Sequence, residues 1–159
     1  MKTKARNVQL YRGEGNTTYL GAQAIGPGFL HLVTAFELET LRMELLRGAA
    51  PFDLEAKLER LSDGGLGHRY IAKNCADFIN LLLASQQRLF QGASRTDVDR
   101  LLRVLAYVRK DDDVIPDYRS DGFADDQQEV HAALIEFNPL LQAFKGWRLR
   151  HQVPVLWTN

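Results

Sequence analysis

The sequence predicts a mostly α-helical protein: a compact bundle of about five helices that carries a small N-terminal β-hairpin. A length of 159 residues fits one domain of ordinary size. Hydrophobic residues at 45% and charged residues at 25% match soluble globular proteins. Apolar residues recur at three- and four-residue steps after residue 28. We therefore expect a single domain with a hairpin arm (1–25), a helical body (28–150) and a C-terminal tail or strand (151–159).

The arm contains two β-prone stretches, Val8–Tyr11 and Thr17–Leu20, on either side of the turn-forming residues Gly13–Asn16. An isolated two-stranded ribbon is marginal in water, so we expect it to pack on the helical body or to gain a third strand. Residues 153–157 (Val-Pro-Val-Leu-Trp) are the candidate strand. Pairing with another chain remains the alternative.

The first three predicted helices follow the apolar spacing. One helix runs from Phe29 to about Arg47, a short one follows Pro51, and a long central helix spans about 66–91. Their expected inward faces are Phe29, Leu32, Val33 and Phe36, then Leu54, Leu58 and Leu61, then Ile71, Cys75, Phe78, Leu82 and Leu89. On the central helix Lys73, Asp77, Asn80 and Gln87 are expected on the opposite, polar face.

The remaining helices lie on either side of an acidic loop. Ser94–Asp97 has the form of a capping box, and it precedes the buried stripe of Val98, Leu101, Leu102, Leu105 and Val108. The helix is expected to stop before Pro116, because proline disfavours helical backbone in the residue before it. A last seam consists of Val130, Leu134, Phe137, Leu141 and Phe144. We expect Asn138 to cap a new helix there, with Pro139 in its first turn, giving two collinear or bent pieces.

Charge and cysteine content exclude several classes of protein. Twenty basic residues balance twenty acidic ones. The sequence therefore gives no strong nucleic-acid signal, and it lacks the net positive charge that would attract the protein to an anionic membrane. The single cysteine cannot form an internal disulfide and no cysteine pair has zinc spacing, which favours a reducing compartment. No export signal and no transmembrane segment is apparent. We therefore expect a cytoplasmic protein.

The segment 101–134 combines an apolar helix, the turn Asp112-Asp113-Val114-Ile115-Pro116-Asp117 and the helix start Asp121-Gly122-Phe123-Ala124-Asp125-Asp126. This order resembles the YkvA-type bacterial family of unknown function. The resemblance implies a helix-loop-helix and a bacterial source, and it brings no known chemistry. The polar residues at 118–120 and 127–129 depart from the family, which is often associated with membranes, and argue against that association here.

The aspartates of the acidic loop have two interpretations. As architecture they form turns and caps, and Asp125 and Asp126 open the next helix, where its dipole favours negative charge. The alternative is a Ca²⁺ or Mg²⁺ site in the loop 112–126, with Asp113, Asp117, Asp121 and Asp125 as ligands. Such a site would support a metal-dependent phosphohydrolase with His131 as base. An EF-hand is excluded, since Arg119 and Gln128 would occupy ligand positions.

Other chemistry-bearing residues have structural explanations. His68 and His131 lack metal-ligand spacing and are expected as surface or cap residues. Cys75 lies in an apolar stripe, which raises its pKa and makes it a packing residue. No nucleophile elbow or phosphate loop occurs, so the sequence indicates no catalytic residue.

The C-terminal region supplies the candidate interaction residues Trp147, Arg148 and Trp157. Trp147 and Arg148 lie in a run that mixes cations with an aromatic ring, a composition also explained by a helix end whose cations complement the dipole. Trp157 requires a covering surface, which we expect to be the hairpin or a second copy of the chain.

The function predicted from these patterns is non-enzymatic. We expect a helical interaction or scaffold module that binds a partner protein or self-associates as a homodimer, without a cofactor. The alternative is the divalent-cation-binding protein described above.

Overall fold

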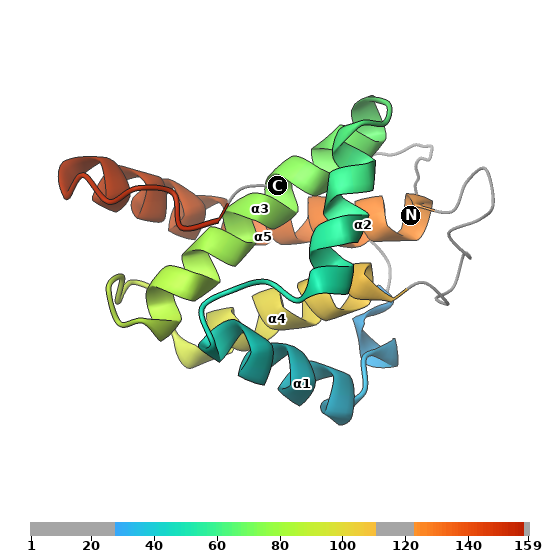
Figure 1. Cartoon of the computed structure of the whole chain (residues 1–159), viewed down its shortest axis with the longest axis horizontal. Helices are drawn as coiled ribbons and strands as arrows, with labels where there is room; N and C mark the ends of the chain where they lie inside the picture. The colour runs from blue at the N-terminus through green and yellow to red at the C-terminus, as the bar shows by residue number, and fades with distance from the viewer. Residues whose placement is uncertain (1–27, 111–122, 158–159) are drawn as a thin grey trace, which may run out of the picture.

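The computed structural model describes residues 28–110 and 123–157, and this part of the chain is helical with no strand (Figure 1). A short 3₁₀ turn, η1, precedes five α-helices. The elements are η1 (Leu30–Leu32), α1 (Ala35–Leu46), α2 (Phe52–Ser62), α3 (Leu66–Gln86), α4 (Arg95–Arg109) and α5 (Ala124–Arg150). The prediction of a mostly α-helical bundle is confirmed for these residues, while the predicted hairpin (1–25) lies outside them.

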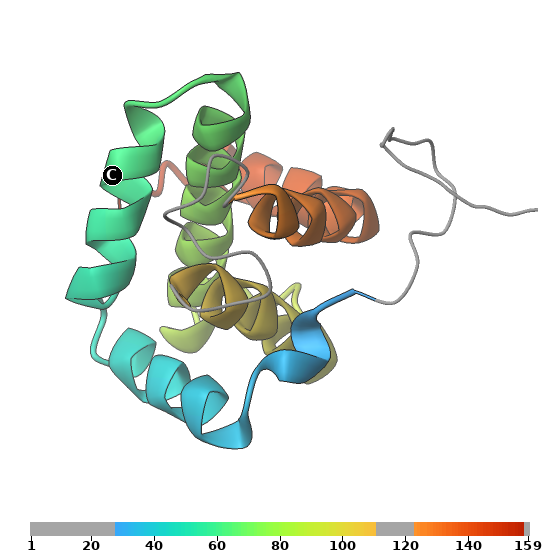
Figure 2. The ribbon, with the colours of Figure 1, turned by 90° about the vertical axis from the view of Figure 1, so that its right-hand side faces the viewer.

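Helix α3 is the centre of the bundle and packs against each of the other four α-helices. Helices α2 and α5 lie on opposite sides of it, and α4 crosses below (Figure 2). Helix α1 packs on α4 and α3 at the edge of the molecule. The predicted central helix is therefore the central helix of the structure.

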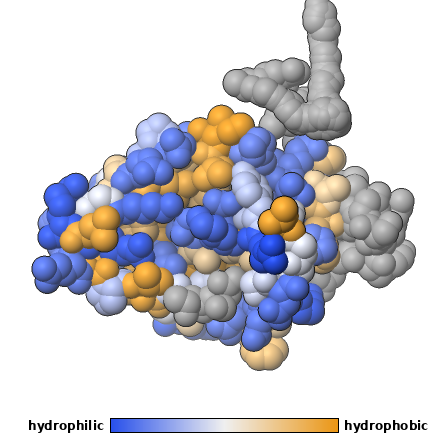
Figure 3. Space-filling model, turned by 90° about the horizontal axis from the view of Figure 1, so that it is seen from above, coloured by the Kyte–Doolittle hydropathy of each residue, from blue (hydrophilic) through white to orange (hydrophobic). Residues whose placement is uncertain are grey.

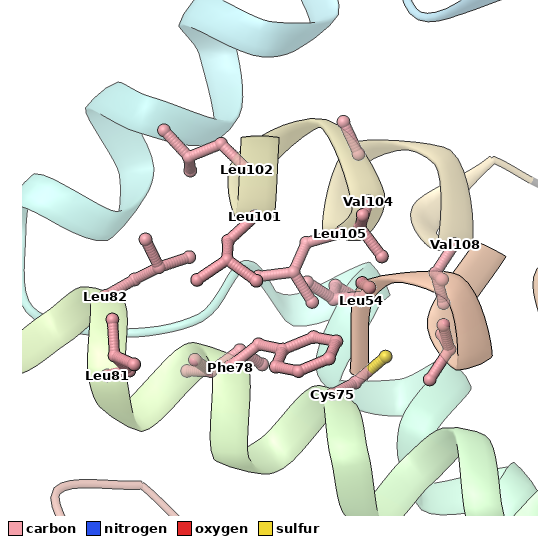
Figure 4. Close-up of a cluster of buried hydrophobic side chains, with 14 of the residues drawn as sticks. Leu54, Cys75, Phe78, Leu81, Leu82, Leu101, Leu102, Val104, Leu105 and Val108 are labelled. Atoms are coloured by element: carbon pink, nitrogen blue, oxygen red, sulfur yellow. The ribbon is translucent and has the colours of Figure 1, made fainter. Parts of the chain in front are cut away.

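The core lies between α3 and α4, whose apolar side chains point toward each other (Figure 4). Burial of such side chains is the main favourable contribution to folding, at roughly 25 cal/mol for each Å² of apolar surface removed from water. The predicted inward positions of α2, and those of α3 before its last turn, are buried. On α4, Leu101, Leu102, Leu105 and Val108 are buried and Val98 is half-buried.

The first helix begins later than predicted and turns a different face inward. Thr34 caps α1, accepting from the amide of Glu37, whose side chain accepts from the Thr34 amide in return. This capping box sets the start at Ala35 and leaves Phe29 and Leu32 in a separate turn. Leu38, Leu41 and Leu45 are the buried residues of α1, so the expectation that Phe36 faces inward is wrong.

The central helix differs from the prediction at two positions. It ends at Gln86, because Arg88 adopts a left-handed backbone with φ of +60° and the Leu89 amide donates back to the Ala84 carbonyl. Leu89 therefore lies exposed beyond the helix. Asn80 was expected on the polar face, but it is buried, because its amide binds the main chain of the C-terminal tail.

Two further predictions concern helix ends. The capping box of α4 is confirmed, since Ser94 and Asp97 bond each other's amides. The expected break at Asn138 is wrong, because α5 is one helix with Pro139 inside it. Proline removes the amide that would bond the carbonyl of Ile135, but both residues are exposed, so water can satisfy that carbonyl.

Residues 151–157 contain no strand, so of the two expectations for this segment, a tail or a strand, the described residues form a tail. The helix end is closed by a hydrogen bond from the Val153 amide to the Arg148 carbonyl, and the tail then turns back to the helical body. The main chain of the tail is hydrogen-bonded to the side chain of Asn80. In a strand, the main chain of a neighbouring strand would form these bonds.

Candidate functional site

A cluster of buried polar side chains surrounds the first turns of α5. Asp125, Asp126 and Glu129 are buried there, together with Lys57 of α2 and Tyr107 of α4. The aspartates lie in the first turn, as predicted, but they are interior groups where capping alone would have left them exposed. Burying ionisable groups is costly unless they are paired and hydrogen-bonded.

The cluster joins three helices through specific contacts. The Tyr107 hydroxyl donates to Asp125 Oδ2 at 2.6 Å. Lys57 Nζ lies 3.5 Å from Asp126 Oδ2 and donates to the Lys110 carbonyl at 2.8 Å. The same ammonium stands 5.5 Å from the centre of the Phe123 ring. These contacts connect α2 and the end of α4 to the start of α5. In the sequence, α4 precedes residues 111–122 and α5 follows them.

Glu129 connects α5 to the residues directly before η1. Its Oε2 accepts from the Phe29 amide at 3.1 Å. A Cβ atom on residue 28 would stand 2.7 Å from the same carboxyl oxygen, so Gly28 permits this approach. Burial raises the pKa of Glu129 from 4.5 to about 7, with a further rise from Asp125 and an opposing effect of the Phe29 amide. Glu129 therefore titrates near neutral pH.

Of the four predicted cation ligands, the structure describes one. Asp113, Asp117 and Asp121 lie outside the described residues. The Asp125 carboxyl is buried and bonded to Tyr107. Among the residues that the structure describes, no three acidic, histidine or cysteine side chains are grouped as a metal ion requires.

The predicted base, His131, lies on the outer side of α5. Its Nδ1 is 2.8 Å from the Tyr70 hydroxyl, and partial burial lowers its pKa. His68 contacts the edge of the Phe123 ring, with ring centres 4.9 Å apart. Cys75 is buried in the core, as predicted, and burial raises the pKa of its thiol far above neutral pH. The structure therefore places these three side chains in separate surroundings.

Trp147 and Arg148 lie together near the end of α5. The Trp147 ring packs against Phe90 and Phe144, with ring centres 5.4 and 6.0 Å apart. The Arg148 guanidinium lies 5.9 Å from the centre of the Phe144 ring. Both side chains are half-buried, so much of their surface serves this aromatic cluster.

Trp157 is buried against helices of its own chain, and the hairpin that was expected to cover it lies outside the described residues. Its ring nitrogen donates to Glu55 Oε2 of α2 at 3.1 Å, and its main chain is bonded to Asn80 of α3. Sequence reasoning assigned Asn80 to solvent and missed this attachment. The signal was present, since Asn80 is the one polar residue within the otherwise apolar run from Phe78 to Ala84.

An apolar face remains exposed on α1. Phe36, Met43 and Leu46 are 79%, 55% and 54% exposed. At 100° per residue they fall within about 80° of one another around the helix. On another face of the molecule, hydrophilic side chains predominate and hydrophobic ones form separate groups between them (Figure 3). The α1 face, defined as Phe36, Met43 and Leu46, is the candidate interaction surface.

Comparisons of this chain with protein-family models, with curated proteins and with solved structures give no match. The resemblance of residues 101–134 to the YkvA-type family therefore stays a prediction. None of the helices described has both the length and the apolar character needed to cross a bilayer.

Proposed function

We propose that this protein is a non-enzymatic interaction module of the cytoplasm, and that it binds another protein chain through the α1 face. The observation that carries the proposal is the exposure of Phe36, Met43 and Leu46 on one side of a helix whose opposite side is in the core. Large apolar side chains grouped on a surface are typical of protein–protein interfaces.

The composition of α1 supports this interpretation. A helix at the surface of a single domain normally has one apolar and one polar face. In α1, Leu38, Leu41 and Leu45 fill the inner face, and the outer face carries apolar residues as well. At 100° per residue Glu39 lies between Met43 and Leu46 around the helix, and its carboxylate pairs with Arg42 at 2.9 Å, so the α1 face carries an ion pair among its apolar side chains.

The dimensions of the α1 face suit a helical partner. Twelve residues make a helix of about 18 Å, and the three exposed side chains are spaced at i, i+7 and i+10. An amphipathic helix laid along α1 would present matching anchors at helical spacing. A single helix face is smaller than the roughly 800 Å² per partner of a standard interface, so we expect weak or transient binding.

The proposal is tested by placing a photo-crosslinking residue at Met43 of the full chain in its native cells. We expect one discrete adduct, and we expect Phe36→Ser in the same chain to abolish it. Leu66 is the matched control position, because it is also an exposed apolar residue of a helix, 80% exposed, at the far end of the bundle.

The outcomes are distinguishable. An adduct at Met43 of twice the chain mass identifies self-association, and a different mass identifies another protein. Equal crosslinking at Met43 and Leu66, or an adduct that survives Phe36→Ser, would overturn the proposal, because binding would then not depend on the α1 face.

A further inference from the structure

We propose that Glu55 and Asn80 form a binding site for a peptide segment that contains Leu-Trp, and that the tail of a second copy of this chain can fill it by exchange. We call these two residues the tail site. In the structure the tail site holds residues 156–157 of the same chain. The inference is independent of the α1 face.

Asn80 recognises the main chain of the tail. Its Oδ1 accepts from the amides of Leu156 and Trp157 at 2.8 and 2.9 Å. Its Nδ2 donates to the Trp157 carbonyl at 2.7 Å and to the carbonyl of Ala76 in its own helix at 2.9 Å. The carboxamide therefore bonds both amide and carbonyl groups of a tail that bends at Leu156. This part of the recognition is independent of the side chains of the tail.

The contacts of Trp157 make the tail site selective for a tryptophan side chain. Its ring is buried and its nitrogen donates to Glu55 Oε2 at 3.1 Å, so both its apolar body and its polar edge have partners. Buried tryptophans with a satisfied N–H are frequent anchors of peptide and protein interfaces. The tail site therefore combines main-chain bonding by Asn80 with an anchor contact for tryptophan.

The tail can separate from the tail site without a change in the helices. Among the described residues, main-chain to main-chain hydrogen bonds end at Val153, and Pro154 has no amide hydrogen to donate. The reversal of direction depends on Gln152, which adopts a left-handed backbone with φ of +54°. A residue other than glycine is strained in this region, so opening the hinge relieves strain while leaving the helices intact.

A second copy is the occupant that the structure supports, because the tail is the sequence shown to fit the site. Exchange of tails between two copies would reproduce the same contacts and release the hinge, and strained short hinges favour such exchange. Attachment within one chain gives an effective tail concentration of about millimolar. We therefore expect a closed monomer at low concentration and exchanged dimers when the protein is concentrated.

The decisive experiment mixes two full-length variants. Asn80→Ala has a defective tail site and an intact tail, and Trp157→Ala has an intact site and a defective tail. In a heterodimer, the intact tail of Asn80→Ala can bind the intact tail site of Trp157→Ala. Neither variant can form this contact with itself. Sedimentation velocity with one variant labelled should show heterodimers with a Kd at least about tenfold below that of either variant with itself.

Further variants separate this inference from the α1 face and from misfolding. Adding Phe36→Ser to both copies should leave the heterodimer intact. A capped synthetic peptide of residues 152–157 should raise the melting temperature of Trp157→Ala and not that of Asn80→Ala. Gln152→Gly, which removes hinge strain, should reduce the dimer fraction of the otherwise unchanged chain.

Two results would overturn the inference. One is a mixture that stays monomeric up to millimolar protein while each variant retains a helical circular dichroism spectrum. The other is a peptide that stabilises both variants equally, because binding would then not require Asn80.

Discussion

Tyr107 and Asp125 form a 2.6 Å hydrogen bond inside the protein, and this bond connects the last turn of α4 to the first turn of α5. Both side chains are buried. Hydrogen bonds to charged groups contribute about 1.5–3 kcal/mol, more than neutral ones, and a buried acceptor that loses its donor is costly. The connection therefore holds together two helices that the chain joins only through residues 111–122.

Replacing Tyr107 with phenylalanine should lower the free energy of unfolding by about 1.5–3 kcal/mol, because the substitution removes the hydroxyl and keeps the ring. Urea denaturation followed by circular dichroism measures the change. Tyr70→Phe is the matched control, since the Tyr70 hydroxyl contacts His131 near the surface. If the free energy of unfolding falls equally in the two variants, the buried hydrogen bond stabilises the protein no more than the contact near the surface does.

Removing Lys57 should destabilise the fold strongly. Lys57→Met takes the ammonium away from Asp126 and leaves a buried carboxyl without that charge, at an expected cost of about 3–5 kcal/mol. The double variant with Asp126→Leu should lose less than the sum of the single variants, as a double-mutant cycle would show. Arg100→Ala, which breaks the exposed pair with Glu136, should cost less than about 1 kcal/mol.

Glu129 should make stability depend on pH. Its folded-state pKa of about 7 is above the ordinary 4.5, so the folded protein binds this proton more tightly than the unfolded chain does. The free energy of unfolding should therefore fall as pH rises from about 4.5 to 7, by about 3 kcal/mol from this group. His131 acts in the opposite sense, because its folded-state pKa is lowered and its protonation disfavours the fold.

Comparison with Glu129→Gln isolates the effect of Glu129. Glutamine keeps an oxygen for the Phe29 amide and removes the titrating group. Denaturation series between pH 5 and pH 8 should diverge for the two proteins, with the variant gaining relative stability as pH rises. Parallel curves would contradict the raised pKa.

Divalent cations should leave the melting temperature unchanged. The cation-binding alternative includes Asp125 among its four ligands, and this carboxyl is buried and bonded to Tyr107. A cation held by the folded state would raise the melting temperature by several degrees through mass action. Thermal melts with EDTA and with millimolar Ca²⁺ or Mg²⁺ measure this. A rise that Asp113→Asn and Asp117→Asn remove would favour the alternative.

Local patterns predicted much of the fold. The stripes of α2 and α4 and the capping box at Ser94 depend on spacing within one helix, so the sequence is sufficient to find them. The sequence also indicated that Cys75 is a packing residue. The break expected at Pro139 was wrong, because an exposed helix face tolerates a carbonyl without its usual partner.

The candidate sites were less predictable, since they depend on contacts between distant segments. Asn80 is polar and was assigned to solvent, yet the tail, 76 and 77 residues further along the chain, supplies its partners. Phe36 was assigned to the core by its spacing from Phe29 and Leu32, but those two residues lie outside α1, and the buried stripe of the helix is Leu38, Leu41 and Leu45.

The sequence by itself determined that this chain forms amphipathic helices around a leucine-rich core, because helical periodicity and capping are local properties. Only the tertiary structure decided which polar groups are buried, that Trp157 is covered by its own chain and that the α1 face remains open. The physical reason is that a polar side chain can be buried when distant segments satisfy its hydrogen bonds, and folding alone brings those segments together.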